Sequence, residues 1–278
     1  MSLGISKNSI FKKSIMSNLK YHFQLVIFIS LLHCSSFAQN SIKTLELGLS
    51  LQMPPGLGTR GAGVAWNPKQ QLYYAAYAGN ASFPMGVFNV KGNRVSSDYL
   101  ECMVDLRSIW YNPRTQKIEA NGYKEEGWVS FSLNSDGIPN DYESIFSGLH
   151  QPDEQSQGVY DYTNNAVYFF DGFGSVFIYD RETGMEAGRF ELSYDENEAD
   201  FSNFDWSIIL TKNVDAEIGI LNRTTMEVDF FSKKTGKFSF RVSLPNDTHI
   251  ADILSFSYCN GYIWILDDNT RRWNGFKL

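Results

Sequence analysis

The sequence predicts an all-β fold made of repeated units of four short strands. First, residues 175–192 (SVFIYDRETGMEAGRFEL) align without a gap with residues 227–244 (EVDFFSKKTGKFSFRVSL). Second, each copy has two runs of alternating apolar residues around a Thr-Gly pair. This pattern indicates a β-hairpin, because successive strand side chains face opposite sides and glycine suits a tight turn. Third, no segment has a helical period long enough to connect parallel strands.

Similar hairpins recur along the chain at regular intervals. If Val87, Val129, Val176, Val228 and Trp273 are equivalent positions, their spacings are 42, 47, 52 and 45 residues. Four-stranded units of this length, arranged radially around an axis, are typical of a β-propeller. The sequence therefore predicts a single propeller with five blades. Six blades are the alternative, if residues 52–60 or 192–204 contain further strands.

Each blade can be placed on the sequence. The first is expected at 63–66, 72–77, 86–90 and 94–100, and the second at 107–111, 117–123, 128–133 and 142–146. The third combines 158–162 and 166–170 with the first hairpin, and the fourth combines 204–211 and 217–221 with the second hairpin. The fifth has only three strands, at 253–258, 262–266 and 272–277. Residues 41–51 alternate well and belong to no other unit, so we expect this N-terminal strand to complete the fifth blade and close the ring.

One hairpin carries a resemblance to known repeats. Residues 176–184, Val-Phe-Ile-Tyr-Asp-Arg-Glu-Thr-Gly, resemble the outer hairpin of the NHL, YVTN and quinoprotein-like propeller repeats. The resemblance extends over the chain as a loose pattern and is clearest in the third and fourth blades. It implies the propeller superfold and no particular family, and this superfold includes enzymes, sugar-binding proteins and protein-docking platforms.

The N-terminal segment is typical of a secretory signal peptide. Four lysines precede the apolar run 23–32, and Ser36-Phe37-Ala38 provides a cleavage site of the small-x-small kind. The run is too short to span a bilayer, which requires about 20 residues. We therefore expect residues 1–38 to be removed and residues 39–278 to form an exported domain, periplasmic or extracellular. A lipid anchor on Cys34 is the alternative, which the bulky His33 disfavours.

Charge and cysteine content limit the partners. Without the leader the chain has 20 basic and 31 acidic residues, a formal charge of −11. Nucleic-acid binding requires a cationic face, so we expect no nucleic-acid partner, and we expect a monomer. Cys102 and Cys259 remain, and the sequence leaves open whether they form a disulfide or stay as two buried thiols. The six tryptophans lie mostly within predicted strands, so we expect them in the core.

Candidate binding residues lie on one face of the propeller. Ligands of propellers usually meet the face built from the loops that precede each first strand and the loops that join second and third strands, here called the loop face. On it the sequence predicts a ligand site formed by Arg107, Tyr123, Glu126, Asp171, Phe173, Asp205, Asp252 and Asp267. The two aromatic rings suit a sugar or a protein partner. The acids would hold calcium if several converged, but Asp in turns commonly caps its own backbone, so we expect no bound cofactor.

These features favour an exported protein that binds a ligand or protein partner on the acidic loop face, without covalent chemistry. The alternative is a hydrolase, lactonase-like or glycosidase-like, that uses a divalent cation or a carboxylate pair at the central channel. It requires at least one shifted carboxyl pKa and convergence on one point of Glu126, Asp171, Asp205, Asp252 and Asp267. Residue 62 is alanine where the lactonase family has a metal-binding glutamate, which counts against this alternative.

Overall fold

The computed structural model describes residues 42–53, 58, 60–79, 85–95, 100–194, 200–214 and 217–278. All of them belong to one compact unit, Ile42–Leu278. The predicted leader, including Cys34, lies outside the described residues. In the part of the chain that the structure describes, no helix is long and apolar enough to cross a membrane.

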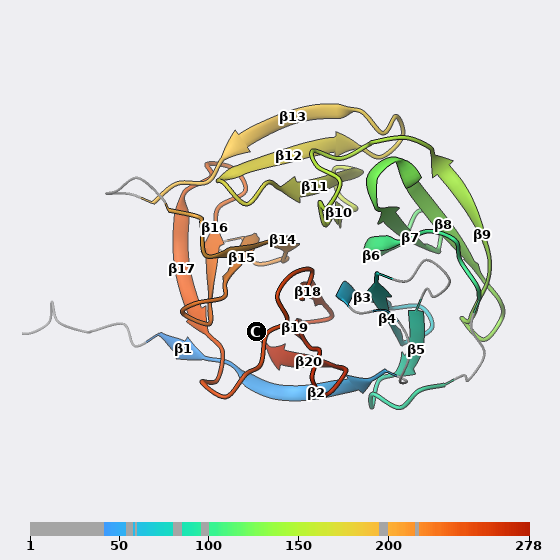
Figure 1. The fold of residues 1–278 in the computed structure, drawn as a ribbon, viewed down its shortest axis with the longest axis horizontal. Coiled ribbons are helices and arrows are strands. Elements are labelled where there is room, and N and C mark those ends of the chain that lie inside the picture. Colours follow the sequence, from blue (N-terminus) through green and yellow to red (C-terminus); the bar gives the residue numbers. More distant parts are fainter. Residues whose placement is uncertain are drawn as a thin grey trace, which may run out of the picture. The chain divides into compact units, whose positions relative to one another are not determined.

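The unit is a five-bladed β-propeller, as the sequence predicts (Figure 1). Blade 1 consists of β3 (Arg60–Asn67), β4 (Leu72–Ala78) and β5 (Met85–Asn89), and blade 2 of β6 (Leu106–Asn112), β7 (Lys117–Gly122), β8 (Trp128–Leu133) and β9 (Pro139–Phe146). Blade 3 consists of β10 (Val159–Asp161), β11 (Ala166–Phe170), β12 (Ser175–Asp180) and β13 (Glu186–Glu191). Blade 4 consists of β14 (Phe204–Leu210), β15 (Ile218–Asn222), β16 (Glu227–Phe231) and β17 (Phe238–Ser243). Blade 5 contains β18 (Phe256–Cys259), β19 (Tyr262–Asp267) and β20 (Arg272–Lys277). The one helical element among the described residues is the 3₁₀ turn η1 (Lys124–Glu126).

A strand near the N-terminus closes the ring, which confirms the prediction. β2 (Glu46–Gln52) pairs antiparallel with β20 and becomes the fourth strand of blade 5, with Leu51 opposite Trp273. Leu51 is completely buried, whereas Leu47 on the same strand is 57% exposed. In addition, β1 (Lys43–Thr44) pairs in parallel with β17 of blade 4, a contact that the sequence does not predict. Residues 43–52 therefore pair with strands of two adjacent blades, blade 4 and blade 5.

The outer edge of blade 1 differs from the prediction. Residues 94–100 were expected to form a fourth strand, but their described part makes a single bridge, between Arg94 and Phe88. Residues 96–99 lie outside the described residues. A sixth blade would need further strands in residues 52–60 or 192–204. In the described parts of these segments there is no additional strand: β2 ends at Gln52, β3 begins at Arg60, and β14 begins at Phe204.

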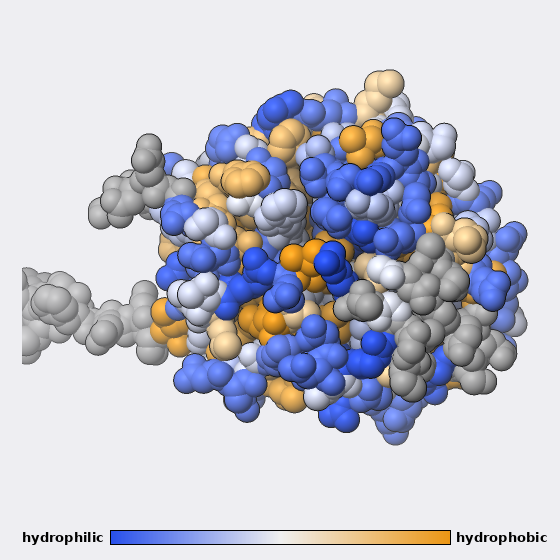
Figure 2. Space-filling model, in the orientation of Figure 1, coloured by the Kyte–Doolittle hydropathy of each residue, from blue (hydrophilic) through white to orange (hydrophobic). Residues whose placement is uncertain are grey.

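Apolar faces of neighbouring blades pack together and form the core. Trp128, Trp264 and Trp273 are completely buried, as expected. Cys102 and Cys259 are both free thiols, so the disulfide alternative is excluded. Burial raises the pKa of the Cys102 thiol to about 11, which makes it unreactive at neutral pH. Outside the core, the face in Figure 2 is largely hydrophilic, with small hydrophobic areas near the middle of the ring.

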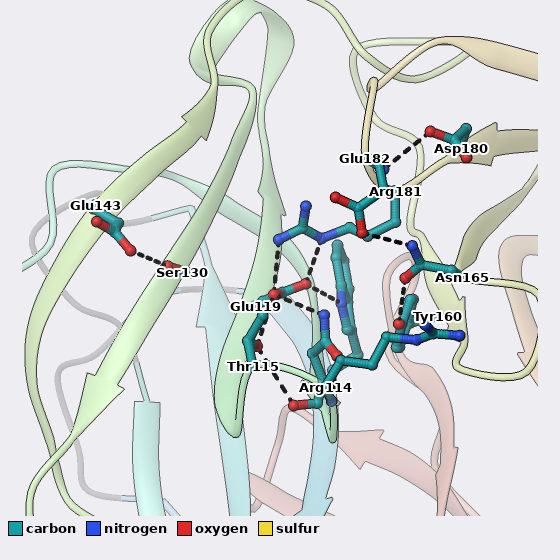
Figure 3. Close-up of polar contacts among 12 residues, drawn as sticks. Arg114, Thr115, Glu119, Ser130, Glu143, Tyr160, Asn165, Asp180, Arg181 and Glu182 are labelled. Atoms are coloured by element: carbon teal, nitrogen blue, oxygen red, sulfur yellow. Dashed lines mark hydrogen bonds and ion pairs between the residues drawn. The ribbon is translucent and has the colours of Figure 1, made fainter.

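The aligned hairpins encode contacts between blades. Arg181, in the β12–β13 turn, forms a bidentate ion pair with Glu119 of blade 2, with N–O distances of 2.7 and 2.8 Å (Figure 3). Lys233, at the aligned position of the β16–β17 turn, pairs with Asp161 of blade 3 at 2.8 Å. In both copies the turn therefore supplies a cation that binds a carboxylate of the preceding blade, which accounts for the repetition in the sequence.

Candidate functional site

The inner strands hydrogen-bond to one another around the axis. The Ser207 hydroxyl contacts both Gln157 and Asp205. Gln157 Nε2 donates to the carbonyl of Phe256 at 3.2 Å, which links blade 3 to blade 5. These polar groups are buried and satisfy one another, so this network is part of the scaffold.

Asp205 lies within this network. It is 1% exposed, accepts the backbone N–H of Ser207 at 2.8 Å and has Ser255 Oγ at 3.4 Å. Burial raises the pKa of its carboxyl group above the usual value, and the hydrogen bonds from Ser207 and the charge of Arg223 partly oppose this. The pairing of β14 shifts register between Phe204 and Ile208, and within this stretch Asp205 and Ser207 are buried while the intervening Trp206 is exposed.

Arg107, Tyr123 and Glu126 come together on blade 2. The guanidinium of Arg107 is buried, donates to both carboxylate oxygens of Asp105 at 2.7 and 3.0 Å and lies 4.4 Å from the centre of the Tyr123 ring. Glu126 Oε2 accepts the N–H of Asp105 at 2.6 Å, and burial raises the pKa of Glu126. Asp105 also accepts the N–H of Gly79 at 2.7 Å. These groups thus satisfy one another and join the loops of blades 1 and 2.

Asp171 and Phe173 share the turn between β11 and β12. Asp171 Oδ1 accepts the N–H groups of Phe173 at 2.7 Å and Ser175 at 3.0 Å, so this carboxylate caps its own turn. The Phe173 side chain is 77% exposed, and its ring centre lies 6.3 Å from that of Trp206 on blade 4. The expectation of a core role is wrong for Trp206, which is 41% exposed.

Asp252 borders a pocket of about 380 Å³ between the loops of blades 4 and 5. Its wall consists of Ser202, Asn203, Arg223, Thr224, Met226, Thr248, His249, Ile250 and Asp252. The Arg223 turn is held in place because its N–H donates to the carbonyl of Asn203 at 3.1 Å. The side chains of Arg223 and Asp252 make no hydrogen bond or ion pair with each other or with any other described residue. The pocket therefore offers one cation and one anion to a ligand.

Asp267 lies in a polar group on blade 5. Its carboxylate accepts from the N–H and hydroxyl of Thr270 at 3.1 and 2.7 Å. The ligand atoms of His249, Asp267 and Asp268 lie within 4.8 Å of one another, and His249 Nε2 is 2.6 Å from Asp268 Oδ1. One imidazole and two carboxylates are donors that suit zinc and similar divalent cations.

The predicted site residues thus fall into separate groups on the propeller: Arg107, Tyr123 and Glu126 lie together, Asp171 and Phe173 share a turn, and Asp205, Asp252 and Asp267 lie elsewhere. Over the residues that the structure describes, the His249 group is the one set of at least three His, Cys, Asp or Glu side chains with ligand atoms this close. The acids that a hydrolase would require do not join it, except Asp267. The sequence prediction also missed two residues, the exposed Trp206 and the half-buried Arg223. Each lies beside a loop of a neighbouring blade, which no local sequence pattern reveals.

The comparisons with known proteins agree with the fold. No family model matches the chain, and no curated protein sequence matches it. The structure of glutaminyl cyclase from Myxococcus xanthus is similar, with a TM-score of 0.56 and 9% sequence identity over 85% of this chain and 97% of that one. The β-propeller domain of Cps50 (Swd1) from Myceliophteria thermophila gives a TM-score of 0.49 and 7% identity over 84% of this chain and 99% of that one. At such low identities the similarity shows the propeller fold alone.

Proposed function

We propose that this chain is an exported binding protein that holds a ligand on the loop face without covalent chemistry. The observation that carries the proposal is the pocket between blades 4 and 5, in which Arg223 and Asp252 lack partners among the described residues. Concave sites with a few unpaired polar groups are the usual ligand sites of proteins. Export is supported by the leader pattern in residues 1–38.

The lining of the pocket favours a polar ligand with an anionic group. A guanidinium binds carboxylates and phosphates with two parallel hydrogen bonds. Asp252 can accept hydrogen bonds from hydroxyl or ammonium groups of the same ligand. Further donors and acceptors are Ser202, Asn203, Thr224 and Thr248, and apolar contacts are available from Met226 and Ile250.

A small ligand is better supported than a protein partner. A standard protein interface buries about 800 Å² on each partner and has an apolar centre. The atoms coloured in Figure 2 show only small hydrophobic areas on the face in view. The polar pocket is therefore better suited to binding a ligand than these areas are to binding a protein.

A hydrolase is the second candidate, and one observation favours it. His249 lines the pocket and also belongs to the group with Asp267 and Asp268, whose donor atoms suit a divalent cation. A cation there would lie at the edge of the ligand pocket and would act as a Lewis acid. This candidate predicts activity toward lactones or esters that EDTA abolishes.

Thermal unfolding tests the binding proposal. The full chain is expressed with its leader, and the resulting protein is heated with organic acids, sugar phosphates, acidic sugars and amino acids, with calcium or EDTA. A ligand that binds only the folded state raises the melting temperature. We expect Arg223→Gln and Asp252→Asn to abolish the rise. Lys234→Gln and Asp247→Asn change the same charges at exposed positions outside the pocket and should retain it. An equal rise in Arg223→Gln would refute the pocket as the site.

A further inference from the structure

Two aromatic side chains from neighbouring blades are exposed side by side on the loop face. Phe173 belongs to a turn of blade 3 and Trp206 to the first strand of blade 4, with ring centres 6.3 Å apart and ring planes 51° apart. Trp206 is the most exposed of the six tryptophans, all of which lie in the described part of the chain. We refer to these two rings as the aromatic platform.

The backbone that carries Phe173 is fixed by hydrogen bonds and by packing on Trp206. Asp171 fixes the turn through the N–H groups of Phe173 and Ser175. Gly172 has a φ of +80°, and a Cβ atom there would lie 2.5 Å from Cδ1 of Trp206, so the turn backbone packs directly on the indole ring. Ordering that is completed in advance lowers the entropic cost of binding.

The aromatic platform and the pocket are neighbours. Asn203, in the pocket wall, precedes Trp206 by three residues and accepts the N–H of Arg223 at 3.1 Å. The charge of Arg223 also acts on Asp205, the residue directly before Trp206. The chain segment 203–206 therefore connects the pocket wall with the aromatic platform.

We infer that the ligand of this face is an oligosaccharide with an acidic sugar unit, whose rings stack on Phe173 and Trp206 and whose carboxylate binds Arg223. This inference rests on the proposed function, because it names the ligand class for the same pocket. A sugar ring has an apolar C–H face that packs on an aromatic ring and an edge of hydroxyl groups that require hydrogen bonds. The hydroxyl and amide groups of Ser202, Asn203, Thr224 and Thr248 provide such bonds.

An acidic saccharide fits these features better than a peptide segment. At this position two adjacent rings are exposed, and the neighbouring residues Ser202 and Asn203 are polar and exposed. A peptide docked by hydrophobic anchors needs deep apolar pockets, whereas the pocket here is lined mainly by polar side chains.

The test is a titration of the purified protein with oligouronates of three to six units, with neutral glucose oligomers and with acidic peptides of similar length. Binding is followed by calorimetry and by tryptophan emission. We expect the oligouronates to bind and to change the emission of Trp206. Phe173→Ala and Trp206→Ala should each raise the Kd at least tenfold. Trp206→Phe should lose the emission change while retaining most of the affinity.

Two further variants complete the test. Arg223→Gln should remove the preference for acidic over neutral saccharides. Tyr162→Ala removes another exposed aromatic ring, in the β10–β11 turn, and should leave binding unchanged. Phe173, Trp206 and Tyr162 are exposed and Arg223 is half-buried, so melting temperatures are measured alongside to show that each variant is folded.

The outcomes separate this inference from the proposed function. If oligouronate binding is equal in wild type, Phe173→Ala and Trp206→Ala, the aromatic platform is not the binding site and the inference is wrong. If only peptides or small anions bind, and Arg223→Gln abolishes their binding, the saccharide inference is wrong while the proposed function stands. If no anionic ligand responds to Arg223→Gln, the proposed function itself is wrong.

Discussion

Arg181 and Lys233 occupy the same position in two successive repeats, and each binds a carboxylate of the preceding blade. They differ in burial. Glu119, the partner of Arg181, is completely buried and also accepts hydrogen bonds from Trp110, Asn112 and Thr115 at 3.1, 2.9 and 3.1 Å. The side chain of Lys233 is 25% exposed and that of Asp161 8% exposed. We therefore expect the two ion pairs at this repeat position to contribute differently to the free energy of unfolding.

Arg181→Gln should strongly destabilise the protein, because it leaves the Glu119 carboxylate buried without its countercharge. Removing one partner of a buried ion pair costs about 3–5 kcal/mol. Lys233→Gln, at the half-exposed equivalent, should cost less than half as much, and urea denaturation followed by fluorescence measures both. Adding Glu119→Gln to Arg181→Gln should recover part of the loss. Equal losses in the two single variants would contradict this assignment.

The pair formed by Asp161 and Lys233 should stabilise the fold in a pH-dependent way. Burial alone would raise the pKa of Asp161, but the hydrogen bond and charge of Lys233 bring it below the usual value of 3.8. A carboxylate with a lowered folded-state pKa contributes stability that is fully present above 3.8 and is lost as pH falls through the lowered value. Wild type should therefore exceed Lys233→Gln in free energy of unfolding near neutral pH, and the difference should shrink in acid. Urea denaturation at several pH values measures this, and a constant difference would count against it.

Asp205 should show the opposite dependence. Because burial raises its folded-state pKa, the free energy of unfolding should fall as pH rises from 3.8 toward that raised value and then level off. Asp205→Asn keeps an acceptor for Ser207 and should abolish this contribution. Asp205→Ala leaves buried donors unpaired and should cost about 1–3 kcal/mol. Melting curves of the three proteins between acid and neutral pH decide the matter, and parallel curves for wild type and Asp205→Asn would show that Asp205 is not the cause.

Closure by β2 should depend on Leu51 far more than on Leu47, two of its three leucines. Leu51→Ala removes a completely buried side chain, which costs about 2–5 kcal/mol at core positions. Leu47→Ala on the same strand is the matched control, since Leu47 is 57% exposed and its loss should change the free energy of unfolding by less than about 0.5 kcal/mol. Denaturant unfolding compares them. Equal losses in both variants would contradict this assignment, and no loss in either would mean that the strand contributes through its backbone alone.

The fold could be predicted because the pattern that specifies it is local. Alternation marks the hairpins, and a Thr-Gly turn marks two of them. The fifth blade had three strands and residues 41–51 belonged to no other blade, so this strand could be assigned to the fifth blade. The contact of β1 with β17 involves two residues, Lys43 and Thr44, which is too short to give a periodic signal.

The candidate site could be predicted only where it depends on single turns. The outward position of Phe173 follows from a turn built of Asp and Gly, which the sequence displays. Asp205 is buried and Trp206 exposed in the irregular stretch of β14, where the packing of blades 3 and 5 around it decides which side is covered. Arg223 borders a pocket only because a loop of the next blade forms the opposite wall. Contacts between residues of different blades cannot be read from the alternation of residues within one strand or turn.

The pairing of β2 with β20 also determines the order in which parts of the propeller can fold. Ser50 Oγ donates to Asn274 Oδ1 at 2.7 Å, across a separation of 224 residues. β2 therefore emerges long before this partner, whether the chain leaves a ribosome or crosses a membrane. During that time the first blades can assemble while β2 keeps an unpaired edge, which chaperones can bind. Completion of the ring is therefore a late event, timed by the arrival of β20.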